Sequence, residues 1–218
     1  MKSTLLKVSL SCAALAMALP ASAAVLTENF NLGGTSQTTS SWTDLSTFNT
    51  LAPDSGPGTL AISGAFQASY GIYSFASDYN FTTTQGASYD IQNVVLQVEL
   101  SPNTEFTFPY GAGPLLSING GQYVIAPDMF KVGASESRNT FGATPLVYED
   151  AVWQWNLSGI TDTVTSVSIL TPVSIHTSTV GVQIDTSNSF NGFVNPVPEP
   201  SAALLSFLGL GALLRRRR

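Results

Sequence analysis

Apolar and polar side chains alternate along several short segments of this chain. Between Asn93 and Leu100 every second residue is apolar, and the residues between them are polar apart from Val95. Such a period of two is typical of a β-strand that buries one face and leaves the other polar. The same alternation recurs more briefly in three other segments: residues 106–108, 153–157 and 180–184. These four segments are therefore predicted to be strands.

A β-hairpin is predicted at residues 115–125. Two apolar runs there flank Asn119, Gly120 and Gly121, which tolerate the positive φ angles of a primed or bulged hairpin turn. Six further strands are expected from short segments bounded by turn-forming residues: residues 25–30, 58–66, 70–75, 145–148, 163–170 and 172–175. The body of the chain has no apolar stripe at helical spacing over the length of a helix.

This pattern predicts an all-β fold for residues 24–195, in the form of a single β-sandwich with a jelly-roll-like arrangement. Two segments are expected to be irregular. Residues 35–50 contain ten Ser or Thr residues among sixteen, which favours a long polar loop that Trp42, Leu45 and Phe48 could anchor. Residues 127–144 form the second irregular segment.

The N-terminal residues 1–23 have the three parts of a secretory signal peptide. Lys2 and Lys7 supply a positive start, residues 8–19 are apolar, and residues 20–23 end in a small-x-small pattern. Signal peptidase is therefore expected to cleave before Ala24. The alternative is an apolar N-terminal helix that joins the core. Cys12 is the only cysteine, so cleavage would leave a mature protein without a thiol or a disulfide.

The C-terminal residues 196–218 have a different three-part order. Three alternating prolines end at Pro200, and the uncharged residues 201–214 and four arginines follow. As a helix, the 14-residue run would extend about 21 Å, which is shorter than the ~30 Å hydrocarbon core of a bilayer. By length alone it could be a core helix. Four arginines follow this run: Arg215, Arg216, Arg217 and Arg218. They instead favour a transmembrane segment with a cytoplasmic end, because long cationic side chains snorkel to the interface.

The last 22 residues, V-P-E-P-S-A-A-L-L-S-F-L-G-L-G-A-L-L-R-R-R-R, resemble a PEP-CTERM sorting signal. The resemblance implies export across the inner membrane of a Gram-negative bacterium and a transient membrane anchor. It also implies processing by exosortase and delivery to the cell surface or extracellular matrix, in a kind of bacterium that commonly makes exopolysaccharide. Pro198, Glu199 and Pro200 are by this resemblance the recognition residues. An ordinary C-terminal anchor with a proline-rich stalk is the alternative.

About 30 residues from Trp153 onward also resemble, much less specifically, the closing strands of jelly-roll PEP-CTERM ectodomains. This second resemblance concerns the fold and carries no activity.

The charge of the body limits the kinds of ligand that it can bind. Only 10% of the residues are charged, whereas about 25% is usual for soluble domains. Residues 24–195 contain 13 acidic residues and two basic ones, Lys131 and Arg138, which gives a formal charge of −11. A body this acidic repels phosphate backbones, so nucleic-acid binding is excluded.

Candidate catalytic groups are few. His176 is the only histidine, and no G-x-S-x-G motif presents a nucleophilic serine, so His176 is interpreted as a hydrogen-bonded structural residue. Glycoside hydrolysis needs two carboxylates that face one cleft. Five acidic residues are available without a signature that pairs them: Glu99, Glu105, Asp128, Glu149 and Asp150. Solvated surface carboxylates are the favoured interpretation, and no catalytic residue is assigned.

Calcium suits this composition better than zinc, because calcium needs only oxygen ligands. Jelly-roll carbohydrate modules often join their first and last strands through such an ion, and by that analogy Glu28 and Asp185 are the candidate ligands. The chain has no D-x-D-x-D-G loop.

Trp153 and Trp155 would share one face of a strand. Two such rings on a sheet surface could stack on sugars, although aromatic residues at this spacing more often belong to the core.

Three hypotheses follow. The first is a non-enzymatic surface or matrix protein that associates with exopolysaccharide. The second is a secreted polysaccharide-active enzyme that uses body carboxylates, and the third is a calcium-stabilised carbohydrate-binding module with an exposed aromatic platform.

Overall fold

Short alternating segments form strands through most of the described chain. The computed structural model describes residues 30–47, 50–101, 113–138 and 146–195. These residues contain no helix. Their strands, in chain order, are β1 (Gln37–Trp42), β2 (Thr59–Ser63), β3 (Phe66–Ala68), β4 (Gly71–Tyr73), β5 (Tyr79–Gly86), β6 (Asn93–Ser101), β7 (Leu115–Ile118), β8 (Tyr123–Ile125), β9 (Met129–Arg138), β10 (Leu146–Asn156), β11 (Ser166–Val173) and β12 (Ser178–Ser187).

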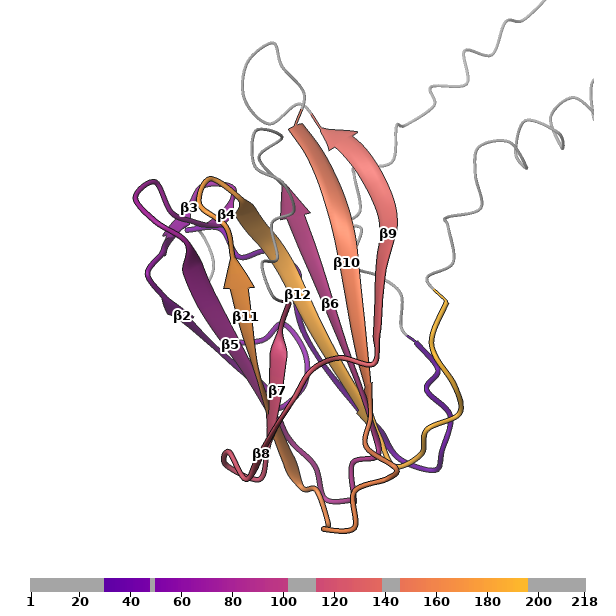
Figure 1. Cartoon of the computed structure of the whole chain (residues 1–218). Helices are drawn as coiled ribbons and strands as arrows, with labels where there is room; N and C mark the ends of the chain where they lie inside the picture. Colours follow the sequence, from indigo (N-terminus) through magenta and orange to yellow (C-terminus); the bar gives the residue numbers. More distant parts are fainter. Residues whose placement is uncertain (1–29, 48–49, 102–112, 139–145, 196–218) are drawn as a thin grey trace, which may run out of the picture.

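The strands form two antiparallel sheets that pack as a β-sandwich (Figure 1). The larger sheet has the order β3-β4-β12-β6-β10-β9, and β1 pairs with the same strand β12 that β4 contacts. The smaller sheet has the order β2-β5-β11-β7-β8. The predicted all-β sandwich is therefore confirmed for the described residues.

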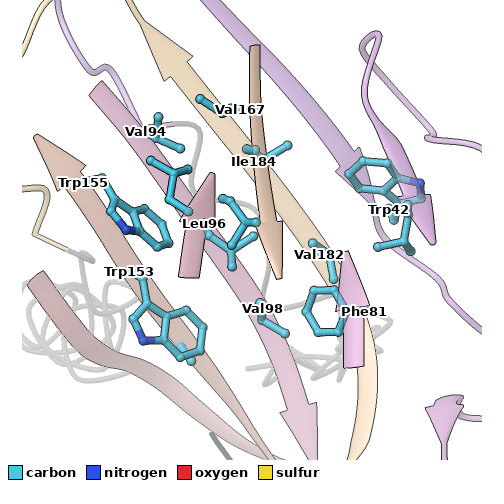
Figure 2. Packing of buried hydrophobic residues seen from close by; sticks show 14 of the residues in the cluster. Trp42, Phe81, Val94, Leu96, Val98, Trp153, Trp155, Val167, Val182 and Ile184 are labelled. Carbon is cyan, nitrogen blue, oxygen red and sulfur yellow. The ribbon is translucent and has the colours of Figure 1, made fainter. Parts of the chain in front are cut away.

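The main core lies between the two sheets and is centred on β6. Val94, Leu96 and Val98 point into it from that strand, as their alternation predicted. The register places Trp155 opposite Val94 and Trp153 opposite Leu96. Figure 2 shows this group together with apolar side chains of β5, β11 and β12. The cost of ordering the strands is offset mainly by this burial, because each large side chain buried contributes about 1.5–3 kcal/mol.

The outer face of the larger sheet is also covered in part. Val95 and Val152 lie there, and Phe30 and Leu32 from the N-terminal described segment pack on them. Val194, from the C-terminal described segment, completes the contact. This second cluster explains why Val95 breaks the polar alternation of its strand.

The two described end segments are tied to each other and to the sheet. The Asn188 carboxamide oxygen accepts hydrogen bonds from the Thr35 and Ser36 amides at 3.1 and 3.2 Å. The Lys131 ammonium group donates to the Val194 carbonyl at 3.1 Å. In Figure 1 the indigo and yellow segments accordingly run side by side.

The hairpin turn is confirmed, and the strands expected at residues 70–75 and 180–184 correspond to β4 and β12. Asn119, Gly120 and Gly121 have φ angles of 46°, 78° and 101° between β7 and β8, as the hairpin prediction required. Residues 58–66, expected as one strand, contain β2 and the start of β3, whereas the two strands expected at 145–148 and 153–157 belong to the single strand β10. The strand expected at residues 106–108 and residues 25–29 of the first expected strand lie outside the described residues.

Two strands were expected at residues 163–170 and 172–175, whereas the structure has one strand, β11, over Ser166–Val173. Pro172 is tolerated within it because β7 ends its pairing at Leu170, so the missing N–H faces no partner strand.

The expectation of two irregular segments is wrong. Residues 35–50 contain β1, and residues 127–144 contain the ten-residue strand β9. Serine and threonine fit a strand when neighbouring groups use their hydroxyls: Ser40 accepts the Gly58 amide at 2.8 Å while its backbone pairs with Ile184. The predicted anchors Trp42 and Leu45 are buried, and Phe48 lies outside the described residues.

Candidate functional site

The predicted sorting residues lie outside the described part of the chain. This applies to the signal peptide at 1–23, to the segment at 201–214, and to the residues Pro198, Glu199, Pro200, Arg215, Arg216, Arg217 and Arg218. The part of the chain that the structure describes contains no helix that could span a bilayer.

The two tryptophans proposed as a sugar-stacking platform are core residues. Trp153 is 2% exposed and Trp155 is 0% exposed, because β10 turns this face toward the smaller sheet. The Trp155 indole N–H donates to the Ile125 carbonyl at 3.1 Å. Figure 2 shows both rings among the buried apolar side chains of the main core. The stacking-platform interpretation of these two residues is therefore wrong.

Asp185 is buried on the outer face of the larger sheet and is surrounded by hydrogen-bond donors. Thr39 donates its hydroxyl to one carboxylate oxygen. Gln183 and Gln97 donate side-chain N–H groups to the other at 2.9 and 3.4 Å. Burial raises the pKa of Asp185, and these hydrogen bonds oppose the shift.

This donor shell does not fit a calcium site. Calcium requires six to eight oxygen acceptors, whereas the groups on Asp185 are donors already committed to its oxygens. The other predicted ligand, Glu28, lies outside the described residues. Within the described ranges, no three His, Cys, Asp or Glu side chains gather as a metal site.

The body carboxylates are less exposed than expected. Glu99 and Asp150 are direct cross-strand neighbours on β6 and β10, and both are buried. The expectation of solvated surface carboxylates is wrong for this pair. Asp128 accepts a hydrogen bond from the Asn156 amide at 2.7 Å. Glu149 precedes Asp150 on β10 and is on the opposite face of that strand. Glu105 lies outside the described residues.

His176 lies in the turn that precedes β12 and has a φ angle of 62°. Its Nδ1 atom shares a 2.9 Å hydrogen bond with the Tyr73 hydroxyl. The interpretation of His176 as a hydrogen-bonded residue is confirmed. This bond also connects the turn to a group of aromatic side chains on β3 and β4.

We call this group the aromatic cluster and define it as Phe66, Tyr70, Tyr73, Phe75 and His176. The Tyr73 ring makes edge contacts with Phe75 at 4.6 Å, Tyr70 at 5.4 Å and Phe66 at 6.5 Å between ring centroids. Phe66 and Phe75 are close to parallel, with an interplanar angle of 26° and a centroid distance of 5.8 Å. Phe66 is 46% exposed and Phe75 is 63% exposed.

Local sequence places these rings on one face. Phe66 is the cross-strand partner of Tyr73, and Phe75 follows two residues later, so the three side chains lie on the same side of the hairpin. The intervening residues Ile72 and Ser74 are buried on the other side. Ile72 in turn belongs to the main core.

A buried polar network supports the hairpin from below. The Tyr79 hydroxyl lies 2.8 Å from the Thr179 hydroxyl and 3.1 Å from the carbonyls of Ile72 and Thr177. Burial raises the pKa of Tyr79, so its hydroxyl keeps its proton. Gly71 allows the close approach to β12, because a Cβ atom there would lie 2.2 Å from the Thr179 carbonyl oxygen.

The cluster is apolar on its rings and carries neutral hydroxyl groups. Desolvation raises the pKa of Tyr70 and of Tyr73, so both phenols are protonated at neutral pH. The two body cations, Lys131 and Arg138, are on β9 at the opposite edge of the sheet. Such a surface can stack on apolar ring faces and donate hydrogen bonds without recruiting an anion.

Sequence reasoning predicted a strand at residues 70–75 and gave it no function. The signal was present, because Tyr73 and Phe75 have the same spacing as Trp153 and Trp155. Comparisons with protein-family models, with curated proteins and with solved structures found no match for this chain.

Proposed function

We propose that this chain is a non-enzymatic surface or extracellular-matrix protein of a Gram-negative bacterium that associates with exopolysaccharide. In this proposal signal peptidase removes residues 1–23, the segment at 201–214 holds the protein briefly in the inner membrane, and exosortase then processes the tail. The observation that carries the proposal is the ordered tail at residues 197–218, with its Pro-Glu-Pro triplet, apolar run and four arginines.

The described body extends almost to the Pro-Glu-Pro triplet, which supports recognition of the triplet beside a folded domain. Asn195, the last described residue before the tail, accepts a hydrogen bond from Lys131 through its side-chain oxygen, and Val194 is bound by both Lys131 and Gln154. The triplet begins three residues after Asn195. A processing enzyme would therefore meet the triplet immediately next to a folded domain.

The strand order supports a jelly-roll-like sandwich as the finer fold assignment. Two four-stranded sets, β1-β12-β6-β10 and β5-β11-β7-β8, lie in different sheets. Along the chain, β5 and β6 belong to different sheets, and so do β11 and β12. Repeated crossing between two sheets is what double Greek-key connectivity produces.

The described body favours a binding or structural module over a hydrolase. The Glu99 and Asp150 pair is buried, whereas a glycosidase needs carboxylates that a sugar chain can reach. The exposed aromatic rings of Phe66 on β3 and Phe75 just beyond β4 are, in contrast, within reach of a sugar chain. Exopolysaccharide association is therefore assigned to the surface of the sandwich.

Processing is tested by replacing Pro198, Glu199 and Pro200 with alanine in the bacterium that makes the protein. We expect export and signal-peptide removal to continue, while C-terminal trimming stops. Mass spectrometry of the membrane and surface fractions measures both ends of the chain. Pro196→Ala is the matched control, because it removes a neighbouring proline outside the triplet and should leave trimming unchanged. Detection of intact Arg215–Arg218 on the unaltered surface protein would overturn the proposal.

A further inference from the structure

We infer that the aromatic cluster is a binding site for the pyranose rings of an uncharged polysaccharide. This inference rests on the proposed surface location and assigns a ligand class to one site on the sandwich. It replaces the buried tryptophans of β10 as the stacking surface.

The first support is the kind of apolar surface that the cluster presents. Phe66 and Phe75 stack on each other, yet they are 46% and 63% exposed, so a large part of each ring remains accessible to a ligand. The C–H face of a pyranose packs on an aromatic ring, while its hydroxyl groups remain free for hydrogen bonds. Tyr123, Phe130 and Phe193 are also exposed aromatic residues, but within the described ranges none of them contributes to a group of four aromatic rings and a histidine like this cluster.

The second support is preorganisation. Tyr73 touches three other rings of the cluster and is hydrogen-bonded to His176. The backbone of the hairpin is fixed in turn, because Ser178 donates its hydroxyl to the Tyr70 carbonyl at 2.7 Å. Rings that already hold their bound positions lose little conformational entropy when a ligand arrives.

The third support is charge. The body carries a formal charge of −11, and its two cations are on the far edge strand β9. Asp78 lies next to the cluster, where its carboxylate accepts the Ile175 amide at 2.9 Å. The negative charge of the body would repel an anionic polymer at this site, whereas it does not oppose the binding of an uncharged polysaccharide.

The test is affinity electrophoresis of the full chain, purified in a mild non-ionic detergent. The protein is run through gels that contain hydroxyethylcellulose, a galactomannan, a xyloglucan or dextran, and through a gel that contains polygalacturonate. At least one uncharged polymer should retard the protein, with or without a calcium chelator. Polygalacturonate should not.

Variants locate the site. Phe75→Ala should weaken binding about 5- to 150-fold, the range measured for losing one stacked ring in the nucleobase case. The double change Phe66→Ala with Phe75→Ala should abolish retardation. Phe193→Ala is the matched control, because that phenylalanine is 47% exposed on the C-terminal described segment, and its removal should leave retardation unchanged.

Two additions keep the test decisive. Phe75→Leu keeps an apolar side chain without a ring, so it should still weaken binding even if an alanine variant unfolds. The triple alanine variant of Pro198, Glu199 and Pro200 should bind normally, which separates this inference from the proposal on sorting. Failure of all four uncharged polymers, retardation only by polygalacturonate, or equal retardation of wild type and the double variant would overturn the inference. Retardation unaffected by the double variant, together with a stoichiometric protein partner lost by that variant, would reassign the cluster to protein binding.

Discussion

The larger sheet carries two aromatic pairs with the same spacing and opposite surroundings. Trp153 and Trp155 on β10 point toward the smaller sheet and are buried. Tyr73 and Phe75 lie on and just beyond β4, where the inward positions are taken by Ile72 and Ser74, so they point away from the core. The spacing of residues along a strand determines which side chains share a face. The packing of the second sheet determines which of the two faces is buried.

The outer face of the larger sheet is covered in one part and exposed in another. Near β6 and β10 it is covered by the end segments of the described chain, which hide Val95 and Val152. At β3 and β4 the rings cover one another instead. Aromatic residues without a covering element are the ones available for a ligand.

The largest effect should come from the buried pair. Trp155→Ala should lower the free energy of unfolding by about 3–5 kcal/mol, because it removes a fully buried ring and leaves a cavity between the sheets. Phe75→Ala should lower it by only about 0.5–1.5 kcal/mol, because the side chain is 63% exposed and loses mainly its ring contacts with Phe66 and Tyr73. Urea unfolding followed by tryptophan fluorescence and circular dichroism measures both. Equal losses of unfolding free energy in the two variants would contradict the difference between the buried and the exposed aromatic pair.

A smaller effect is expected where the exposed cluster is attached to the sandwich. Gly71→Ala should destabilise by roughly 1–3 kcal/mol, because φ is 117° and the added Cβ would meet the Thr179 carbonyl. Gly120→Ala is the control, since its φ is also positive and nothing lies within 4 Å. Thermal unfolding should show the larger loss for Gly71→Ala. A larger loss for Gly120→Ala would show that backbone strain, and not contact with β12, dominates.

The polar support beneath the cluster gives the next effect. Tyr79→Phe should cost about 1–2 kcal/mol, because it leaves the Thr179 hydroxyl and two buried carbonyls without this partner. Tyr123→Phe loses only an exposed bond to Asp162 and should be close to neutral. Chemical denaturation compares the two variants, and a neutral Tyr79→Phe would mean that the hairpin does not depend on this network.

The covered part of the outer face should show the smallest effect, as a dependence on pH. Because burial raises the pKa of Asp185, the native state binds its proton more readily than the unfolded chain does. This contribution to stability is complete below the ordinary pKa of aspartate and is lost as pH rises through the raised native value. Asp185→Asn should flatten that decline in a series of denaturation curves, and the exposed Asp162→Asn should not. If the dependence of stability on pH were the same in Asp185→Asn as in the unaltered protein, the raised pKa of Asp185 would be contradicted.

Parts of this fold could be predicted because a single local rule determined them. Alternation in β6 follows from its central place in the sandwich, and the hairpin at residues 115–125 follows from three residues that accept positive φ. β1 and β9 were missed since their polar residues find partners far along the chain, as Thr39 does with Asp185. The exposed cluster was missed for a related reason: alternation alone does not reveal which face a second sheet covers.

The adjacency of the two described ends has a consequence for how this body can be joined to other chains. The Asn188 amide donates to the Ser36 carbonyl at 3.1 Å, so the chain enters and leaves the sandwich at almost the same point. Domains with adjacent ends tolerate circular permutation and insertion into a host loop, because neither operation stretches the fold. The aromatic cluster is on the edge formed by β3 and β4, away from that point of entry. The described body could therefore be inserted as a domain into a longer polypeptide, and its aromatic cluster would remain exposed.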